Sequence, residues 1–83
     1  MPSTYILEDQ KEKIYIGSCI NLESRFLDHL RGNTLSTKNF INPKIAWRKD
    51  FDDLKEARAC ERKIKKWKSR KMINFLIVGE IKL

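Results

Sequence analysis

The chain has 83 residues and a formal net charge of +7, with 18 Lys and Arg against 11 Asp and Glu. This length predicts one small domain over residues 1–83 and excludes a second lobe that could enclose a small substrate, while the charge favours a polyanionic partner such as nucleic acid. No apolar run approaches the roughly 20 residues of a membrane-spanning helix, and the N-terminus lacks the pattern of a secretion signal, so we expect a cytoplasmic protein without membrane contact.

The first two elements are short runs of apolar and β-branched residues at positions 4–7 and 13–16, separated by five polar residues. This pattern predicts an antiparallel hairpin. We expect a register in which Tyr5 lies directly opposite Tyr15, because two residues that face each other across an antiparallel pair project from the same face of the sheet. The hairpin would then bring the two phenol rings together.

The next element is a helix over residues 22–31, which Asn21 can cap and which Gly32 can end in a left-handed conformation. Its predicted buried stripe consists of Leu22, Phe26 and Leu30. Arg25 and His29 are four residues apart at the margin of this stripe, so their side chains are neighbours and are expected to point toward the sheet edge.

The segment over residues 32–43 is mostly polar and predicts an exposed loop. Within it, Thr37 and Lys38 are candidate contacts for phosphate. A third, shorter strand is predicted over residues 44–47. The loop would therefore connect the first helix to the last strand of the sheet.

Two further helices are predicted after this strand. Asp53 followed by Glu56 is a capping-box pattern that begins a long basic helix over residues 54–67, and Ser69 can cap a final helix through Ile77. The resulting order, β-β-α-β-α-α, indicates an α+β fold in which helices flank a three-stranded antiparallel sheet in two layers.

Glu61 is the only acid between Arg58 and Lys71, a run that contains eight basic residues. On the predicted helix it projects between Leu54 and Ala57, on the apolar side. A carboxylate at the edge of a core costs desolvation free energy unless it meets a cation, several donors or a metal ion. The alternative is a helix ion pair, which contributes only about 0.3–0.5 kcal/mol when exposed. Glu61 is therefore the leading candidate for a functional residue.

The basic side chains of the long helix and the turn after it form either a solvated surface or a track for phosphates. Candidate nucleic-acid contacts are Lys65, Lys68 and Arg70, and Trp67 among them is either a core residue or a stacking platform. The pattern contains no dedicated recognition helix, so we expect specificity to come from nucleic-acid shape or from a protein partner.

Several short motifs follow one another in a characteristic order. They are Thr4-Tyr5-Ile6-Leu7, Tyr15-Ile16-Gly17, Asn21-Leu22-Glu23-Ser24-Arg25-Phe26 with His29, Gly32-Asn33-Thr34 with Ser36-Thr37-Lys38, and Glu56-Ala57 with Glu61. In this order the chain resembles the GIY-YIG nuclease family over nearly its whole length. It is most similar to small single-domain members related to the nuclease domain of excinuclease. It departs from the family pattern at Ser3-Thr4-Tyr5, which lacks the glycine that names the first motif.

The resemblance implies a metal-dependent endonuclease that hydrolyses DNA phosphodiester bonds, with a structure selectivity suited to repair or recombination. Its catalytic residues would be Tyr5, Tyr15, Arg25, His29 and Glu61. One Mg²⁺ or Mn²⁺ ion would bind Glu61 and keep several waters. Arg25 would hold the scissile phosphate, and one tyrosine would accept the proton of the attacking water. His29 would orient a tyrosine or the water, or contact phosphate directly.

Several assignments stay open at this point. Either tyrosine can be the proton acceptor, Asn74 is only a candidate for a further site position, and Gly17 is expected to permit a close backbone approach. RNA is an alternative substrate to DNA. A nucleic-acid-binding module recruited by a larger complex is the alternative to an enzyme, and a subunit interaction domain with Trp47 or Phe51 as exposed anchors is a third interpretation.

Overall fold

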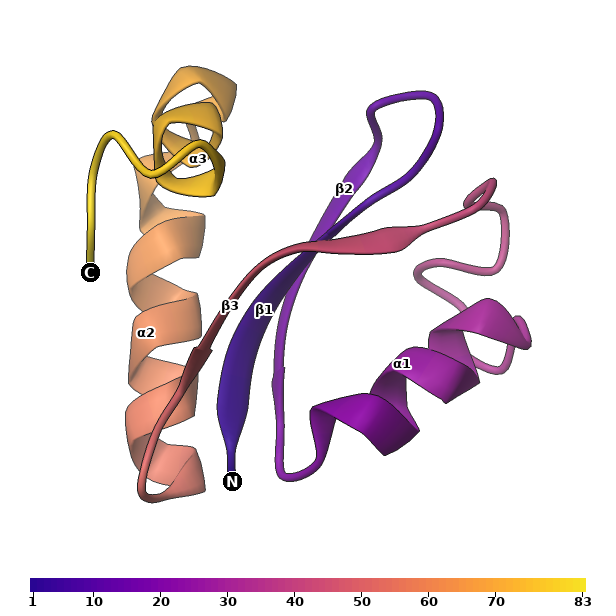
Figure 1. Ribbon diagram of the computed structural model, residues 1–83, viewed down its shortest axis with the longest axis horizontal. Coiled ribbons are helices and arrows are strands. Elements are labelled where there is room, and N and C mark those ends of the chain that lie inside the picture. The colour runs from indigo at the N-terminus through magenta and orange to yellow at the C-terminus, as the bar shows by residue number, and fades with distance from the viewer.

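The computed structural model describes residues 1–83 and contains three strands and three helices in the predicted order (Figure 1). The elements are β1 (Ser3–Glu8), β2 (Ile14–Cys19), α1 (Leu22–Leu30), β3 (Lys44–Asp50), α2 (Leu54–Trp67) and α3 (Arg70–Ile77). The α+β class is confirmed. All three strands extend beyond their predicted ends, because backbone pairing continues past the apolar residues on which the prediction depended. No helix is of the length and apolar character needed to cross a membrane.

The strands form one antiparallel sheet in the order β2-β1-β3, so β2 is an edge strand. In the β1–β2 pair, Tyr5 lies opposite Gly17 and Leu7 lies opposite Tyr15. The expectation that Tyr5 lies directly opposite Tyr15 is therefore wrong by two residues. Because side chains alternate with a period of two, this shift keeps both tyrosines on the same face, and their ring centroids are 6.1 Å apart.

Helices cover both faces of the sheet, with α1 on one side and α2 and α3 on the other (Figure 1). The fold thus has three layers rather than the two expected. The cluster beneath α1 consists of Tyr5, Leu7, Cys19 and Leu22, whereas the cluster beneath α2 and α3 consists of Ile6, Ile64, Ile73 and Leu76. The central strand is a continuous buried run, which is the pattern of a strand that is covered on both faces.

Side chains cap the helices where the sequence predicted them. Asn21 accepts from the backbone N–H of Ser24 at 3.0 Å, and Asp53 accepts from that of Glu56 at 2.8 Å. Ser69 caps α3 in the same way. These acceptors satisfy N–H groups that have no partner within the helix. Gly32 has a φ of +73°, which confirms the left-handed stop after α1.

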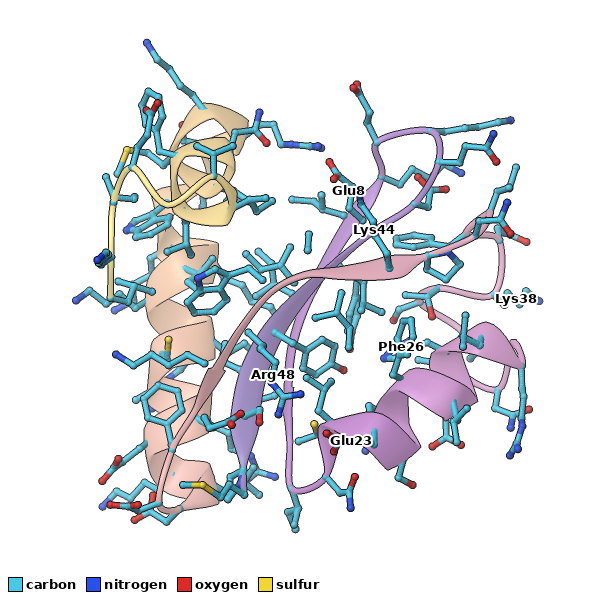
Figure 2. The ribbon with its side chains drawn as sticks, viewed as in Figure 1. Glu8, Glu23, Phe26, Lys38, Lys44 and Arg48 are labelled. Carbon is cyan, nitrogen blue, oxygen red and sulfur yellow. The ribbon has the colours of Figure 1, made fainter.

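The buried stripe of α1 differs from the prediction at one position. Leu30 is 50 % exposed, whereas His29 is only 2 % exposed. Leu22, Phe26 and His29 are spaced four and three residues apart and therefore lie on one face of the helix. Figure 2 shows Phe26 on the side of α1 that faces the sheet. The core beneath α1 thus contains a histidine at the place where a leucine was expected.

The proposed anchors of a subunit interaction domain are not free. Trp47 packs against the cluster beneath α2 and α3, and so does Trp67. Phe51 is partly buried beneath the ammonium of Lys49. These aromatic rings therefore belong to the protein's own packing, and the third interpretation loses the exposed anchors on which it depended.

Candidate active site

Three buried side chains from separate elements form a hydrogen-bonded chain between the sheet and α1. The hydroxyl of Tyr5, on the central strand β1, lies 3.0 Å from Nε2 of His29, in the last turn of α1. Nδ1 of His29 lies 2.6 Å from Oγ1 of Thr37, in the loop that follows. The two bonds use both ring nitrogens of His29, so the imidazole has one fixed orientation.

Burial decides where the protons lie in this chain. It is the largest cause that raises the pKa of the Tyr5 phenol above its usual range, and the nearby Tyr15 acts in the same direction. Burial, and then the positive charge of Arg25, lowers the pKa of His29. At neutral pH we therefore assign a protonated Tyr5 and a neutral His29. Tyr5 then donates to Nε2, and Nδ1–H donates to Thr37.

Thr37 does not lie on the surface as expected. It is 1 % exposed, and its hydroxyl is paired with His29. Its backbone N–H bonds to the carbonyl of Thr34, and its own carbonyl accepts from Phe40, so consecutive turns direct this part of the loop inward. The expectation of a phosphate contact is therefore wrong for Thr37. Lys38 remains exposed and extends away from the loop (Figure 2).

Tyr15 has a different environment from Tyr5 although their rings are close. It lies on the edge strand β2, is partly buried, and its ring centroid is 5.1 Å from that of His29. No side chain or backbone group pairs with its hydroxyl, and no buried polar side-chain atom lacks a partner, so this hydroxyl reaches solvent. Tyr15 therefore offers an accessible phenol oxygen beside the buried chain.

Gly17 makes room for both phenol rings. A Cβ atom at this position would lie 2.8 Å from a ring carbon of Tyr15 and 2.8 Å from the phenol oxygen of Tyr5. Both distances are shorter than real Cβ contacts, and both rings are held by their surroundings. The expected close approach at Gly17 is thus confirmed, and the atoms that approach it belong to the two tyrosines.

Arg25 is exposed on α1, one turn before His29. Its guanidinium has neither an ion pair nor a hydrogen bond within the protein. Its charge lowers the pKa of His29 and opposes the rise in the pKa of Tyr5, so it lies within electrostatic range of both. The guanidinium can therefore present all five of its N–H donors to an external anion.

Glu61 lies on α2 with its side chain 20 % exposed, in agreement with the predicted place at the edge of the core. Its Oε1 accepts from the hydroxyl of Ser18 at 2.5 Å, and its Oε2 pairs with the ammonium of Lys65 at 2.6 Å. Ser18 is a residue that sequence reasoning missed. The alternation along β2 was the available signal, because it directs Ser18 away from the face that bears Tyr15 and Gly17.

The tyrosines and Glu61 therefore lie on opposite faces of the sheet. They approach each other at β2, which contributes Tyr15 to one face and Ser18, the partner of Glu61, to the other. Because β2 is an edge strand, no further strand separates the two faces on this side. The edge also explains why the charge of Glu61 contributes to the raised pKa of Tyr5 across the strand.

The residues around Glu61 fit a hard divalent cation. The carboxylate and the Ser18 hydroxyl supply oxygen atoms, the ligands that Mg²⁺ and Mn²⁺ prefer. No three His, Cys, Asp or Glu side chains group together in the chain, so any such ion would keep most of its waters. Lys65 occupies the same carboxylate, and an ion would compete with its ammonium for Oε2.

The other predicted nucleic-acid contacts differ in their availability. The guanidinium of Arg70 bonds to the carboxylate of Glu8 at 2.9 Å, to the carbonyl of Glu12 at 2.6 Å and to the side chain of Asn74 at 3.0 Å. Arg70 therefore holds α3 to the β1–β2 hairpin and is not free for phosphate, and Asn74 is engaged there too. Lys68 is exposed at the turn between α2 and α3.

Comparison with known proteins gives one match. A protein-family model described as the GIY-YIG catalytic domain matches residues 1–74. No curated protein and no solved structure matches the chain. The matched range includes both tyrosines, the buried histidine, the unpaired arginine and the carboxylate on α2.

Proposed function

The chain belongs to the GIY-YIG nuclease family, and from this membership we propose that it is an endonuclease that hydrolyses DNA phosphodiester bonds with one divalent cation, Mg²⁺ or Mn²⁺. Family membership makes it a nuclease, a hydrolase that acts on nucleic acid; the cation, the choice of DNA and the roles of single residues are our proposal. The observation that carries it is the approach of an accessible phenol, an unpaired guanidinium and a carboxylate around the edge strand β2.

Arg25 is assigned to the scissile phosphate. Its guanidinium is exposed and has no partner in the protein, so it can bind two phosphate oxygens without first breaking an ion pair. The same charge would offset the negative charge that develops on those oxygens in the transition state. Arg25 thus combines positioning with electrostatic stabilisation.

Tyr15 is assigned as the group that accepts the proton of the attacking water. Its hydroxyl reaches solvent, whereas Tyr5 is buried, protonated and already donating to His29. We therefore treat Tyr5, His29 and Thr37 as positioning residues, whose hydrogen bonds hold the surface against which the Tyr15 ring packs.

Glu61 is assigned as the metal ligand, with the Ser18 hydroxyl beside it. A divalent cation held there would supply Lewis-acid stabilisation to the phosphate oxygens. Lys65 neutralises Glu61 in the absence of the cation, and its exposed side chain is free to swing away to a phosphate when the carboxylate is taken.

The choice among nucleic-acid substrates follows from what the surface lacks. The elements around the site present no recognition helix for reading base edges, while a net charge of +7 attracts any polyanion. We therefore propose that DNA shape, such as a branch or a flap in repair or recombination, or else a protein partner, provides the specificity.

The alternative is a nucleic-acid-binding module with little activity, recruited by a larger complex. The ion pair between Lys65 and Glu61 favours it, because a neutralised carboxylate is a weaker site for a cation. A module of this kind would bind DNA equally well with or without divalent cations, apart from the screening of charges by salt.

The test is cleavage of labelled duplex, single-stranded, nicked and branched DNA with Mg²⁺, Mn²⁺ or chelator, for wild type and Glu61→Gln. We expect the variant to lose about 10²-fold or more in cleavage rate while it retains DNA binding, because a ligand that stabilises developing charge is removed. Glu56→Gln is the matched control, since it makes the same charge change on an exposed position of the same helix. Tight wild-type binding without cleavage in any metal would favour the binding module.

A further inference from the structure

A cleft of about 290 Å³ lies where the end of β2, the first turns of α1 and the first turns of α2 meet. Only three of its nine lining residues are hydrophobic. The volume lies at the lower limit of the roughly 300–1,000 Å³ of pockets for drug-sized ligands, which are mostly apolar. The cleft therefore suits a small charged group rather than an apolar molecule.

Two arginines line this cleft, Arg25 from α1 and Arg58 from α2. Neither forms an ion pair or a hydrogen bond. The contrast with Arg48 is clear, because its guanidinium bonds to Asp50 at 2.8 Å and to Glu23 at 3.4 Å and so holds β3 to α1 (Figure 2). Arg58 has no such structural contact, although it lies beside a second cation.

The charges in the cleft are not balanced by the protein. Asp28 is the only carboxylate in the lining, and it pairs with neither arginine. Two guanidinium groups that share one cleft repel each other unless an anion lies between or against them. The first turn of α1 also opens onto the cleft, and the N-terminal end of a helix carries partial positive charge. The missing counter-charge must therefore come from outside the chain.

The cleft is continuous with the proposed catalytic site. Ser18 lines the cleft and also donates to Glu61. Arg58 precedes Glu61 by three residues, so the two side chains are neighbours on α2. We propose that Arg58 binds the phosphate next to the scissile one, so that the cleft holds two consecutive phosphates of one strand. This inference rests on the proposed role of Arg25 in holding the scissile phosphate.

The test uses probes that differ by one phosphate. Affinities for thymidine 5′-monophosphate and thymidine 3′,5′-bisphosphate are measured by NMR titration of the wild type, Arg58→Gln and Arg62→Gln. We expect the wild type to bind the bisphosphate about tenfold more tightly, because a second charge-assisted contact forms. Arg58→Gln should lose this preference yet bind the monophosphate within about twofold of wild type.

Arg62→Gln is the matched control. It removes the same charge from the same helix at an exposed position that does not line the cleft, so it should keep the preference for the bisphosphate. The spectrum of each variant reports whether it is folded, and Arg58 has no partner whose loss would unfold the chain. Equal preferences in Arg58→Gln and wild type, equal loss in both variants, or no preference in the wild type would each overturn the proposal.

A cleavage measurement separates this inference from the proposed function. In an active enzyme, Arg58→Gln should raise KM for DNA about tenfold with little change in kcat, because the contact is made to a phosphate that does not react. A wild type that cuts no DNA but prefers the bisphosphate through Arg58 would refute the endonuclease and leave the second phosphate site standing. A lower kcat with unchanged KM would instead refute the assignment to a neighbouring phosphate.

Discussion

Tyr5 and Tyr15 share one face of the sheet and differ in what surrounds their hydroxyl groups. Tyr15→Phe removes the accessible phenol, and we expect a loss of about 10²-fold or more in kcat, the contribution typical of a positioned general base. Tyr5→Phe removes a buried donor and leaves Nε2 of His29 without a partner, which should cost about 1–3 kcal/mol of stability. Cleavage rates and urea unfolding of both variants check this prediction.

A reversed result would be equally informative. If Tyr5→Phe abolished cleavage while remaining folded, and Tyr15→Phe retained it, the buried phenol would have to become accessible when DNA binds. Tyr5 would then be the proton acceptor, and His29 would be the group that receives its proton through Nε2.

Gly17 allows a prediction with a control at another glycine. Gly17→Ala places a methyl group against both phenol rings, so we expect about 1–3 kcal/mol of destabilisation and at least about tenfold lower activity. Gly79→Ala meets no atom within 4 Å but must adopt a φ of +85°, which should cost about 1–2 kcal/mol with activity within about twofold of wild type. Thermal unfolding and cleavage rates distinguish the two; an active Gly17→Ala would show that the rings can shift.

At the scale of elements, α2 and β2 together hold the carboxylate. The N-terminus of α2 depends on Asp53, which accepts from the backbone of Glu56. We expect Asp53→Ala to cost about 1 kcal/mol, within the range of about 0.5–2 found for N-caps, and Asp52→Ala, which has no such bond, to stay within about 0.5 kcal/mol. Urea unfolding checks this pair of variants, and equal losses would mean that charge near the helix end, rather than the cap, is responsible.

The same elements explain why much of the fold was predictable. The caps at Asn21, Asp53 and Ser69 and the stop at Gly32 depend on residues no more than three positions away, and all four are found as predicted. The stripe of α1 was wrong at Leu30 because helical periodicity alone does not decide whether the stripe lies over position 29 or position 30. The position of α1 against Tyr5 made that choice.

For the whole molecule, the pH dependence of unfolding should be determined near neutrality by the only histidine. Burial lowers the pKa of folded His29 below its usual 6.5, so the unfolded chain binds the proton first as the pH falls. The stability that neutral His29 contributes is therefore fully present above the unfolded pKa and is lost as the pH falls through the folded pKa. We expect the free energy of unfolding to decrease from about pH 7 to about pH 5 in the wild type.

His29→Gln is the variant that tests this dependence, because glutamine can still bond but does not titrate. Its free energy of unfolding should change less than that of the wild type over the same pH range. The carboxyl groups of Asp9 and Asp50 have pKa values below their usual range, so they act at lower pH. Parallel curves for the two proteins would show that His29 is not the group responsible.

The sequence by itself determined the elements and their order, the helix caps, the shared face of the tyrosines and the place of Glu61 at the edge of a core. These features depend on periodicity and on contacts between residues a few positions apart. Only the tertiary structure decided the strand register, the bonds of His29 to Tyr5 and Thr37, the bond of Ser18 to Glu61 and the cleft shared by two arginines. Tyr5 and His29 are 24 residues apart and Ser18 and Glu61 are 43 apart, so their pairing depends on how whole elements pack against the sheet.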